Sequence, residues 1–132
     1  MRDVFANRVA NNVLSRVAKD LARGKAVVCL SRADLEREIR YSTKTRGIGA
    51  PYMKAPVCAN PACGQFLSFG DGNCHAASPS VHKIRPSKGY VQGNITIICF
   101  ACNEAIGESE SLEAVNRKRA ALDFQAKLLG EN

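Results

Sequence analysis

The chain lacks the features that mark membrane and secreted proteins. No apolar run approaches the roughly 20 residues that a membrane-spanning helix needs. The N-terminus carries Arg2, Asp3 and Arg8 without an uninterrupted apolar stretch, so we expect no secretory signal. There is no internal repeat and no low-complexity tract. We therefore expect no membrane association and a cytoplasmic location, and 132 residues are most simply one domain with an appendage.

Acidic residues are scarce in the first part of the chain. Residues 1–56 hold 12 Lys and Arg against 5 Asp and Glu, a balance of +7 that equals the net charge of the whole chain. Residues 57–107 hold 3 against 2, and residues 108–132 hold 4 against 5. This asymmetry favours a polyanion as partner. Helix faces that merely keep the protein soluble would give the same totals, so charge alone does not choose between the two interpretations.

Apolar periodicity predicts two helices in this basic region. Residues 3–23 place apolar side chains on one slowly drifting helical face, namely Phe5, Val9, Val13, Val17 and Leu21. Residues 31–39 offer Ser31 as an N-cap, with Asp34 three residues later. Residues 42–56 contain two Gly and two Pro and are expected to form a loop, in which Lys44 and Arg46 are candidate nucleic-acid contacts. An ordinary exposed linker is the alternative.

A further helix is predicted at the end of the chain. Residues 111–132 repeat apolar side chains at helical spacing, with Gly130 after the last turn, and the apolar positions are Leu112, Val115, Leu122, Ala126 and Leu129. We expect this helix to pack on the core of the domain.

Two close cysteine pairs are the strongest motif. Cys58 and Cys63 have the spacing C-x4-C, and Cys99 and Cys102 have the spacing C-x2-C. Each tight turn can present two thiolates to one ion, and four thiolates form a closed tetrahedral zinc site that is structural. Without a secretion signal, metal ligation is a better interpretation of paired cysteines than disulfides. Of the other two cysteines, Cys29 is expected to be a small buried apolar residue and Cys74 a loop thiol.

The segment between the cysteine pairs predicts two strands and a helix. "SVHKI" alternates apolar and polar residues and indicates a short strand over residues 80–84. "RPSKGY" interrupts it, and the β-branched run "NITIIC" predicts a second strand over residues 94–99. A helix is expected to start at Asn103.

The stretch from Pro79 to Asn103, "PSVHKIRPSKGYVQGNITIICFACN", resembles the HNH endonucleases, the ββα-metal nucleases. The likeness is to small phage and prophage members with a four-cysteine zinc site, in which "PS-x-x-x-I-x-PSKGY-x-x-GN" precedes "C-x-x-C-N". It implies an α+β fold with a zinc-stapled HNH-like core over residues 57–110. The basic helical region 1–56 would precede this core, and the C-terminal helix 111–132 would pack on it. It also implies a bacterial host cell as the setting.

The resemblance assigns roles position by position. His82 falls on a metal-ligand position, Lys83 on the position of the general base, and Asn94 on the central Asn that orients the loop and the base. Asn103 falls on a second metal-ligand position. Family chemistry would be hydrolysis of a DNA phosphodiester with a second divalent ion such as Mg²⁺, Mn²⁺, Ni²⁺ or Zn²⁺. Two flanking residues are candidate phosphate contacts, Arg85 and Lys88.

Two positions depart from the family pattern. Lys83 stands where a histidine is usual, and a lysine with the ordinary pKa of about 10.4 is protonated at neutral pH and cannot accept a proton. Gly107, one helical turn beyond Asn103, offers no side-chain ligand. Alternatives for the base are His82 in a shifted register, His75 folding back into the site, and Tyr90.

Three hypotheses follow. The first is a metal-dependent DNA endonuclease or nickase with an atypical base. The second is a catalytically silent HNH-like zinc module that binds nucleic acid or a protein partner. The third is a zinc ribbon unrelated to nucleases, which would leave "PSKGY-x-x-GN" unexplained. Two copies of the chain can also act together as a homodimer, and the sequence does not decide this.

Overall fold

The computed structural model describes residues 2–49, 53–107 and 123–130. The elements follow one another as α1 (Arg2–Ala22), α2 (Arg32–Ser42), β1 (Lys44–Gly47), β2 (Lys54–Val57), β3 (Pro79–Lys83), the 3-10 turn η1 (Pro86–Lys88), β4 (Ile95–Cys99), α3 (Phe100–Ile106) and α5 (Asp123–Gly130). The chain therefore combines helices with two small sheets, which confirms the α+β class.

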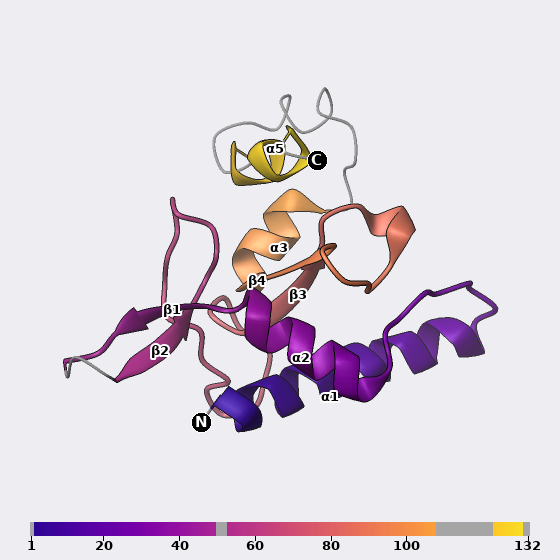
Figure 1. The fold of residues 1–132 in the computed structure, drawn as a ribbon, viewed down its shortest axis with the longest axis horizontal. Helices are drawn as coiled ribbons and strands as arrows, with labels where there is room; N and C mark the ends of the chain where they lie inside the picture. The colour runs from indigo at the N-terminus through magenta and orange to yellow at the C-terminus, as the bar shows by residue number, and fades with distance from the viewer. Residues whose placement is uncertain (1, 50–52, 108–122, 131–132) are drawn as a thin grey trace.

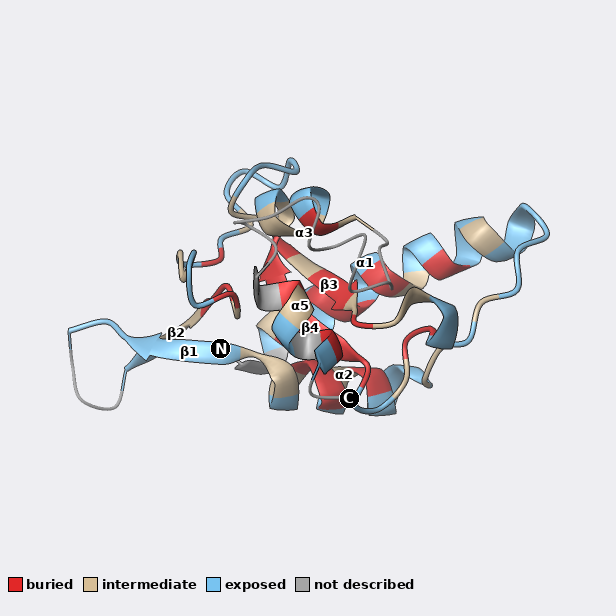
Figure 2. Ribbon diagram, turned by 90° about the horizontal axis from the view of Figure 1, so that it is seen from above, coloured by how far each residue is buried: buried red, intermediate tan, exposed pale blue. Residues whose placement is uncertain are grey.

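The centre of the fold is the antiparallel hairpin β3–β4 between two helical layers (Figure 1). Helices α1 and α2 pack on each other and cover one face of the hairpin, while α3 and α5 lie on the opposite side. All five residues of β4 are buried, as expected for a strand covered on both faces. Figure 2 shows this burial as a red centre formed by β3, β4 and the inner faces of α1 and α2.

Helix α1 confirms the predicted amphipathic pattern over most of its length. Val9, Val13 and Val17 are buried, together with Ala6 and Ala10 beside them. The prediction was wrong at Leu21, whose side chain is 54% exposed. The last turns of α1 extend past the β3–β4 hairpin (Figure 1).

Helix α2 begins as the sequence predicts. The Ser31 side chain accepts a hydrogen bond from the Asp34 backbone N–H, with 3.3 Å between Oγ and N. The Asp34 carboxylate does not complete a capping box but pairs with Arg37 at 2.9 Å. Glu38 on the inner face of α2 accepts a hydrogen bond from the Gly93 backbone N–H at 3.0 Å, which ties the helix to the β3–β4 connection.

The expected loop over residues 42–56 is instead mostly a β-hairpin. Strands β1 and β2 are antiparallel, with Lys44 opposite Val57 and Gly47 opposite Lys54. The hairpin is largely exposed and projects from the body of the molecule (Figure 2). The prediction failed because the segment has few β-branched residues and two glycines, so its pairing depends on the opposite strand more than on local preference.

Helix α3 starts three residues earlier than predicted. The helix begins at Phe100 because Cys99 serves as its N-cap, the Cys99 Sγ accepting a hydrogen bond from the Cys102 backbone N–H at 3.4 Å. Asn103 therefore lies inside the helix and projects from its first turns rather than from a preceding loop.

The C-terminal helix is described only over α5. Within it Leu129 is buried and Ala126 packs against the core, as the periodicity predicts. Leu112, Val115 and Leu122 lie outside the described residues. The predicted regions of the chain are 1–56, 57–110 and 111–132. One apolar core contains residues from all three, including Ala6 in α1, Ile97 in β4 and Leu129 in α5. None of the described helices combines the length and the apolar character that crossing a membrane requires.

Candidate metal centre and active site

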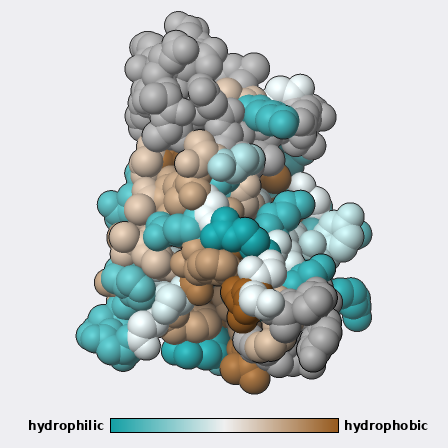
Figure 3. Space-filling model, turned by 90° about the vertical axis from the view of Figure 1, so that its left-hand side faces the viewer, coloured by the Kyte–Doolittle hydropathy of each residue, from teal (hydrophilic) through white to brown (hydrophobic). Residues whose placement is uncertain are grey.

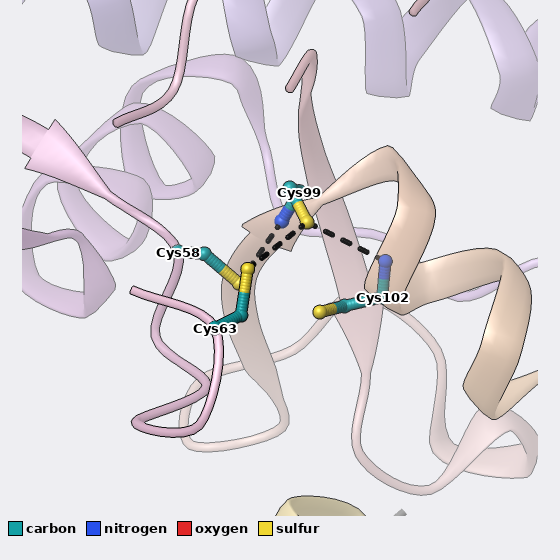
Figure 4. Close-up of side chains that lie close together, drawn as sticks. All are labelled: Cys58, Cys63, Cys99 and Cys102. Atoms are coloured by element: carbon teal, nitrogen blue, oxygen red, sulfur yellow. Dashed lines mark hydrogen bonds between the residues drawn. The ribbon is translucent and has the colours of Figure 1, made fainter. Parts of the chain in front are cut away.

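Four cysteines meet where the first sheet joins the second. Cys58 and Cys63 lie in the turn after β2, Cys99 ends β4, and Cys102 lies in the first turn of α3 (Figure 4). Their four Sγ atoms all lie within 4.8 Å of one another, and the Sγ atoms of Cys63 and Cys99 are 3.8 Å apart. All are free thiols. The predicted grouping is confirmed, and these four sulfurs can bind a metal ion such as zinc.

Local hydrogen bonds shape both cysteine turns. The Asn60 Oδ1 accepts from the Ala62 backbone N–H at 3.1 Å, and the Asn60 carbonyl accepts from the N–H groups of Cys63 and Gly64. In the second pair the Cys99 backbone N–H donates to Cys58 Sγ at 3.3 Å. Asn60 Nδ2 also donates to Cys102 Sγ at 3.6 Å. Donors aimed at sulfur are the outer contacts that thiolate–metal sites use to orient their ligands.

The thiol pKa values show what a cation would change. Burial raises the pKa of Cys58 to about 11, and burial likewise raises the pKa of Cys102. At Cys99 burial acts in the same direction, but the Cys102 N–H and neighbouring side chains outweigh it and lower the pKa. Thiols with raised pKa values, such as those of Cys58 and Cys102, are poor thiolates alone, whereas a bound Zn²⁺ deprotonates its thiol ligands. The donor set fits zinc, and four protein ligands leave no open position for a reacting water.

The remaining two cysteines lie outside this cluster. Cys29 is half-buried against the core and forms an isolated parallel bridge with Tyr90, close to the buried apolar role predicted for it. Cys74 is an exposed loop thiol.

His82 lies on β3, on the same face as Ser80, and is only 3% exposed. Its Nε2 lies 2.7 Å from the Oε1 of Gln125 in α5. Gln125 is fully buried, and its Nε2 donates to the Ile84 carbonyl at 3.1 Å, which fixes the orientation of the amide. The Gln125 carbonyl oxygen can only accept, so His82 donates through Nε2–H and its Nδ1 carries the lone pair.

Burial lowers the pKa of His82, and Lys83 acts in the same direction, while the side chains of Gln125 and Asn103 oppose the shift through hydrogen bonds. The imidazole is therefore neutral at neutral pH. Asn103 approaches from α3, where its Nδ2 donates to Ser80 Oγ at 2.6 Å. The structure thus brings His82 and Asn103 together across the gap between β3 and α3.

Lys83 and Tyr90 meet beside this pair. The Lys83 ammonium lies 5.0 Å from the centroid of the Tyr90 ring, a cation–π contact. Burial raises the pKa of Tyr90, with Arg16 opposing the shift, so the phenol remains protonated at neutral pH and is not a base.

A polar pocket of ≈ 300 Å³ joins these side chains to α1. His82, Lys83 and Asn103 contribute to its wall. The remaining lining residues are Arg16, Asp20, Arg23, Lys25, Val81, Pro86, Tyr90 and Gly107. Four cations therefore face one carboxylate, Asp20, around a histidine and an amide. Such a pocket suits a phosphate group.

Asn94 holds the connection between β3 and β4 in shape. Its Oδ1 accepts from the Arg85 backbone N–H at 3.0 Å, and its Nδ2 donates to the carbonyls of Arg85 at 3.0 Å and Gly89 at 2.7 Å. The side chain is buried and does not line the pocket. Its contacts are those of a residue that orients the loop.

The candidate phosphate contacts differ in their surroundings. Lys88 and Lys44 are exposed, and Arg46 places its guanidinium 4.3 Å from the centroid of the Phe66 ring. Arg85 is half-buried, and its guanidinium donates to the Leu129 carbonyl at the end of α5 at 3.3 Å. Arg85 therefore binds the last turn of α5, where a cation also complements the helix dipole.

His75, the other histidine considered as a base, lies away from the pocket. It sits in an exposed loop with its Nδ1 3.0 Å from Ser78 Oγ, and it does not line the pocket.

Sequence reasoning missed Gln125 and the α1 contribution to the pocket. The α1 contribution could have been predicted, because Arg16 and Arg23 are basic residues that lie beside the apolar face of the predicted helix. Nothing local indicated Gln125, whose partner lies 43 residues away in the chain.

Comparison of the chain with protein-family models, with curated proteins and with solved structures gives no match.

Proposed function

We propose that this protein is a zinc-stapled, HNH-like endonuclease or nickase that hydrolyses DNA phosphodiester bonds with a second divalent ion. One observation supports it above the others: His82, Lys83 and Asn103, on a strand and a helix that follow the ββα order, line one pocket that four cations surround. The Pro79 to Asn103 motif assigns active-site roles to these same three residues.

His82 and Asn103 would hold the second ion. The Nδ1 lone pair of His82 and the amide oxygen of Asn103 are both neutral donors, which suits Mn²⁺, Ni²⁺ or Zn²⁺ better than Mg²⁺. When bound, such an ion supplies a Lewis acid for the scissile phosphate and the leaving oxygen. In the described part of the chain only the four cysteines form a cluster of three or more cysteine, histidine or carboxylate ligands, so substrate oxygens would have to complete this second site.

The pocket cations would hold the phosphate itself. Arg16 and Arg23 on α1 and Lys83 on β3 all line the pocket, and a guanidinium binds two phosphate oxygens at once. Lys83 fits this role better than that of a base, because its ammonium already lies over the electron-rich face of Tyr90. His82 is then either the metal ligand or, through the same Nδ1, the proton acceptor.

A silent HNH-like module is the second candidate, and a separate observation favours it. The Gln125 amide caps the His82 imidazole at 2.7 Å, and α5 covers the β3 face on which His82 lies. A helix that permanently occupies this side would preserve the zinc fold and the cationic pocket while leaving the histidine out of reach of a substrate. DNA would then be a ligand, and a protein partner would be possible.

Cleavage of supercoiled and linear DNA separates the two. Zinc-loaded protein would be incubated with Mg²⁺, Mn²⁺ or Ni²⁺, or with no added ion, alongside His82→Ala and His75→Ala. These are the only two histidines, so the second variant is a matched control. We expect ion-dependent nicking that falls by about 10²-fold or more in His82→Ala and persists in His75→Ala.

Two further variants assign the roles. Lys83→Arg keeps the charge and cannot act as a base, so retained activity makes Lys83 a phosphate contact. Gln125→Ala removes the cap, and activity that appears only in this variant would mean that α5 blocks the site. No cleavage by any of these proteins with any ion would refute the nuclease and leave the silent module.

A further inference from the structure

Three hollows lie in succession along α1 and share lining residues. The first, ≈ 680 Å³, is at the start of α1 beside the β1–β2 hairpin. The second, ≈ 640 Å³, lies between the middle of α1 and residues 69–81, and the third is the ≈ 300 Å³ pocket at His82. Phe69 lines the first two, and Arg16 and Arg23 line the last two. We call this series of hollows the α1 groove.

The α1 groove has a strongly uneven charge. Among the residues that the structure describes, its walls hold eight Lys and Arg but one acidic residue, Asp20. The cations are Arg8, Arg16, Lys19, Arg23, Lys25, Arg40, Lys54 and Lys83. Concave walls with one sign of charge concentrate the field and attract an extended anion.

The cations on α1 form a ladder with a regular step. Counting Asn12 as one step, the series Arg8, Asn12, Arg16, Lys19 and Arg23 advances by three or four residues at a time, and all five are exposed. Four helical residues rise about 6 Å, and the ladder is about 22 Å long. The step is close to the spacing of successive phosphates along an extended strand, so the ladder can meet several phosphates in turn.

The first hollow is apolar and aromatic. The rings of Phe5 and Phe69 lie 5.8 Å apart, and the Arg8 guanidinium lies 3.8 Å from the Phe69 centroid. Met53 is 45% exposed at the same hollow. Figure 3 views the molecule from the side of the β1–β2 hairpin and shows apolar side chains gathered among hydrophilic ones on this face. Unpaired bases stack on aromatic and guanidinium faces, whereas a duplex keeps its base faces inside the stack.

We propose that the α1 groove binds a single strand of nucleic acid, with bases against Phe5 and Phe69 and phosphates on the α1 ladder, and leads it to the His82 pocket. This deepens the proposed function by naming the form of the substrate. It rests on that function only for the hydrolysis at the His82 pocket. Binding along the groove needs no second metal ion and no catalysis.

Fluorescence anisotropy with a labelled oligo-dT and a duplex of equal length tests the groove directly. Zinc-loaded full-length protein would be titrated without added divalent ion at about 50 and 200 mM NaCl. The variants are Arg8→Ala and Lys19→Ala on the ladder, and Phe69→Leu, which keeps apolar volume but loses the ring. Arg37→Ala is the matched control, because Arg37 is exposed on α2 and does not line the groove.

We expect the single strand to bind more tightly than the duplex. Arg8→Ala and Lys19→Ala should each reduce the slope of log affinity against log salt by about 0.7, the value for one phosphate contact on a single strand. Phe69→Leu should weaken binding at least about fivefold with an unchanged slope. Arg37→Ala should bind like the unaltered protein.

Three results would overturn the inference. They are duplex binding as tight as single-strand binding, ladder variants that behave like Arg37→Ala, or no oligonucleotide binding even at low salt. Each is independent of the cleavage experiment. If the protein nicks DNA but the ladder variants bind like the unaltered protein, the proposed function stands and this inference fails. If the ladder variants lose binding but no protein cleaves DNA, this inference stands and the proposed function fails.

Discussion

At the scale of single residues, the proposed function depends most on His82. Its surroundings are fixed from two sides, since Gln125 accepts from Nε2–H and Asn103 approaches from α3. Both partners are neutral amides whose hydrogen bonds favour the protonated ring, but burial and Lys83 outweigh them and lower the pKa of His82. A histidine held neutral and in one tautomer is suited to present its other nitrogen as a ligand or base.

The lowered pKa of His82 predicts a pH effect on stability. Because the folded-state pKa lies below the ordinary value of about 6.5, the unfolded chain binds more protons between the two values. The contribution of His82 to stability is fully present above about pH 6.5 and falls as the pH decreases towards the folded-state pKa, by at most about 1.4 kcal/mol per pH unit. Urea unfolding should show that the free energy of unfolding falls less between pH 7.5 and 5.5 for His82→Gln than for the unaltered protein.

His75→Gln is the control for this comparison, since His75 lies in an exposed loop. The cysteines are the same in all three proteins, so any protonation of the metal site cancels in the difference. An identical pH dependence for His82→Gln and the unaltered protein would show that the buried imidazole does not titrate as described.

At the scale of elements, the connection between β3 and β4 determines where the pocket lies. Gly89 has a φ of 79°, and a Cβ there would overlap the Val28 carbonyl oxygen. This close approach lets the Tyr90 N–H donate to Val28 at 2.9 Å and the Leu30 N–H donate to Tyr90 at 2.9 Å. The turn thereby ties the segment between α1 and α2 to the hairpin and positions Tyr90 beneath Lys83.

Gly89→Ala should therefore destabilise the protein more than Gly93→Ala. Gly93 also has a positive φ, 78°, but an added Cβ there meets nothing within 4 Å. Alanine at Gly93 should cost about 1 kcal/mol of unfolding free energy through backbone strain alone, and alanine at Gly89 should cost at least about 2 kcal/mol because the backbone must also move apart. Urea denaturation of both variants measures this difference. Equal losses would mean that the contact with Val28 is not maintained.

The elements also show where local sequence was informative. α1, α2, β3 and β4 could be predicted because their apolar periods and the Ser31 cap are properties of adjacent residues. The start of α3 was misplaced because a cysteine of the four-cysteine cluster, Cys99, also serves as the cap. The β1–β2 hairpin and the Gln125 contact could not be predicted, because each depends on a partner that only the tertiary fold brings near.

At the scale of the whole molecule, the four cysteines join parts that otherwise share few contacts. The exposed β1–β2 hairpin leads directly into Cys58 and Cys63, while Cys99 and Cys102 belong to the buried β4 and the helix that carries Asn103. An ion at this junction would fix α3 against the end of β4, which pairs with β3, and so keep Asn103 beside His82. The metal centre and the candidate active site are thus mechanically linked through five residues of chain, from Cys99 to Asn103.

Removal of the metal should accordingly disturb both sites. We expect one zinc per chain, released by a chelator together with loss of the cooperative thermal transition, because the free energy of zinc binding contributes directly to folding. Cys58→Ser should lose the zinc, since Cys58 is buried within the cluster, and Cys74→Ser should keep both the zinc and the transition, since Cys74 is exposed outside it. Metal content by atomic absorption and melting followed by circular dichroism measure the two effects. An unaltered transition after complete zinc removal would show that the apolar core around Ile97 and Ile98 is sufficient, and that the four sulfurs do not support the fold.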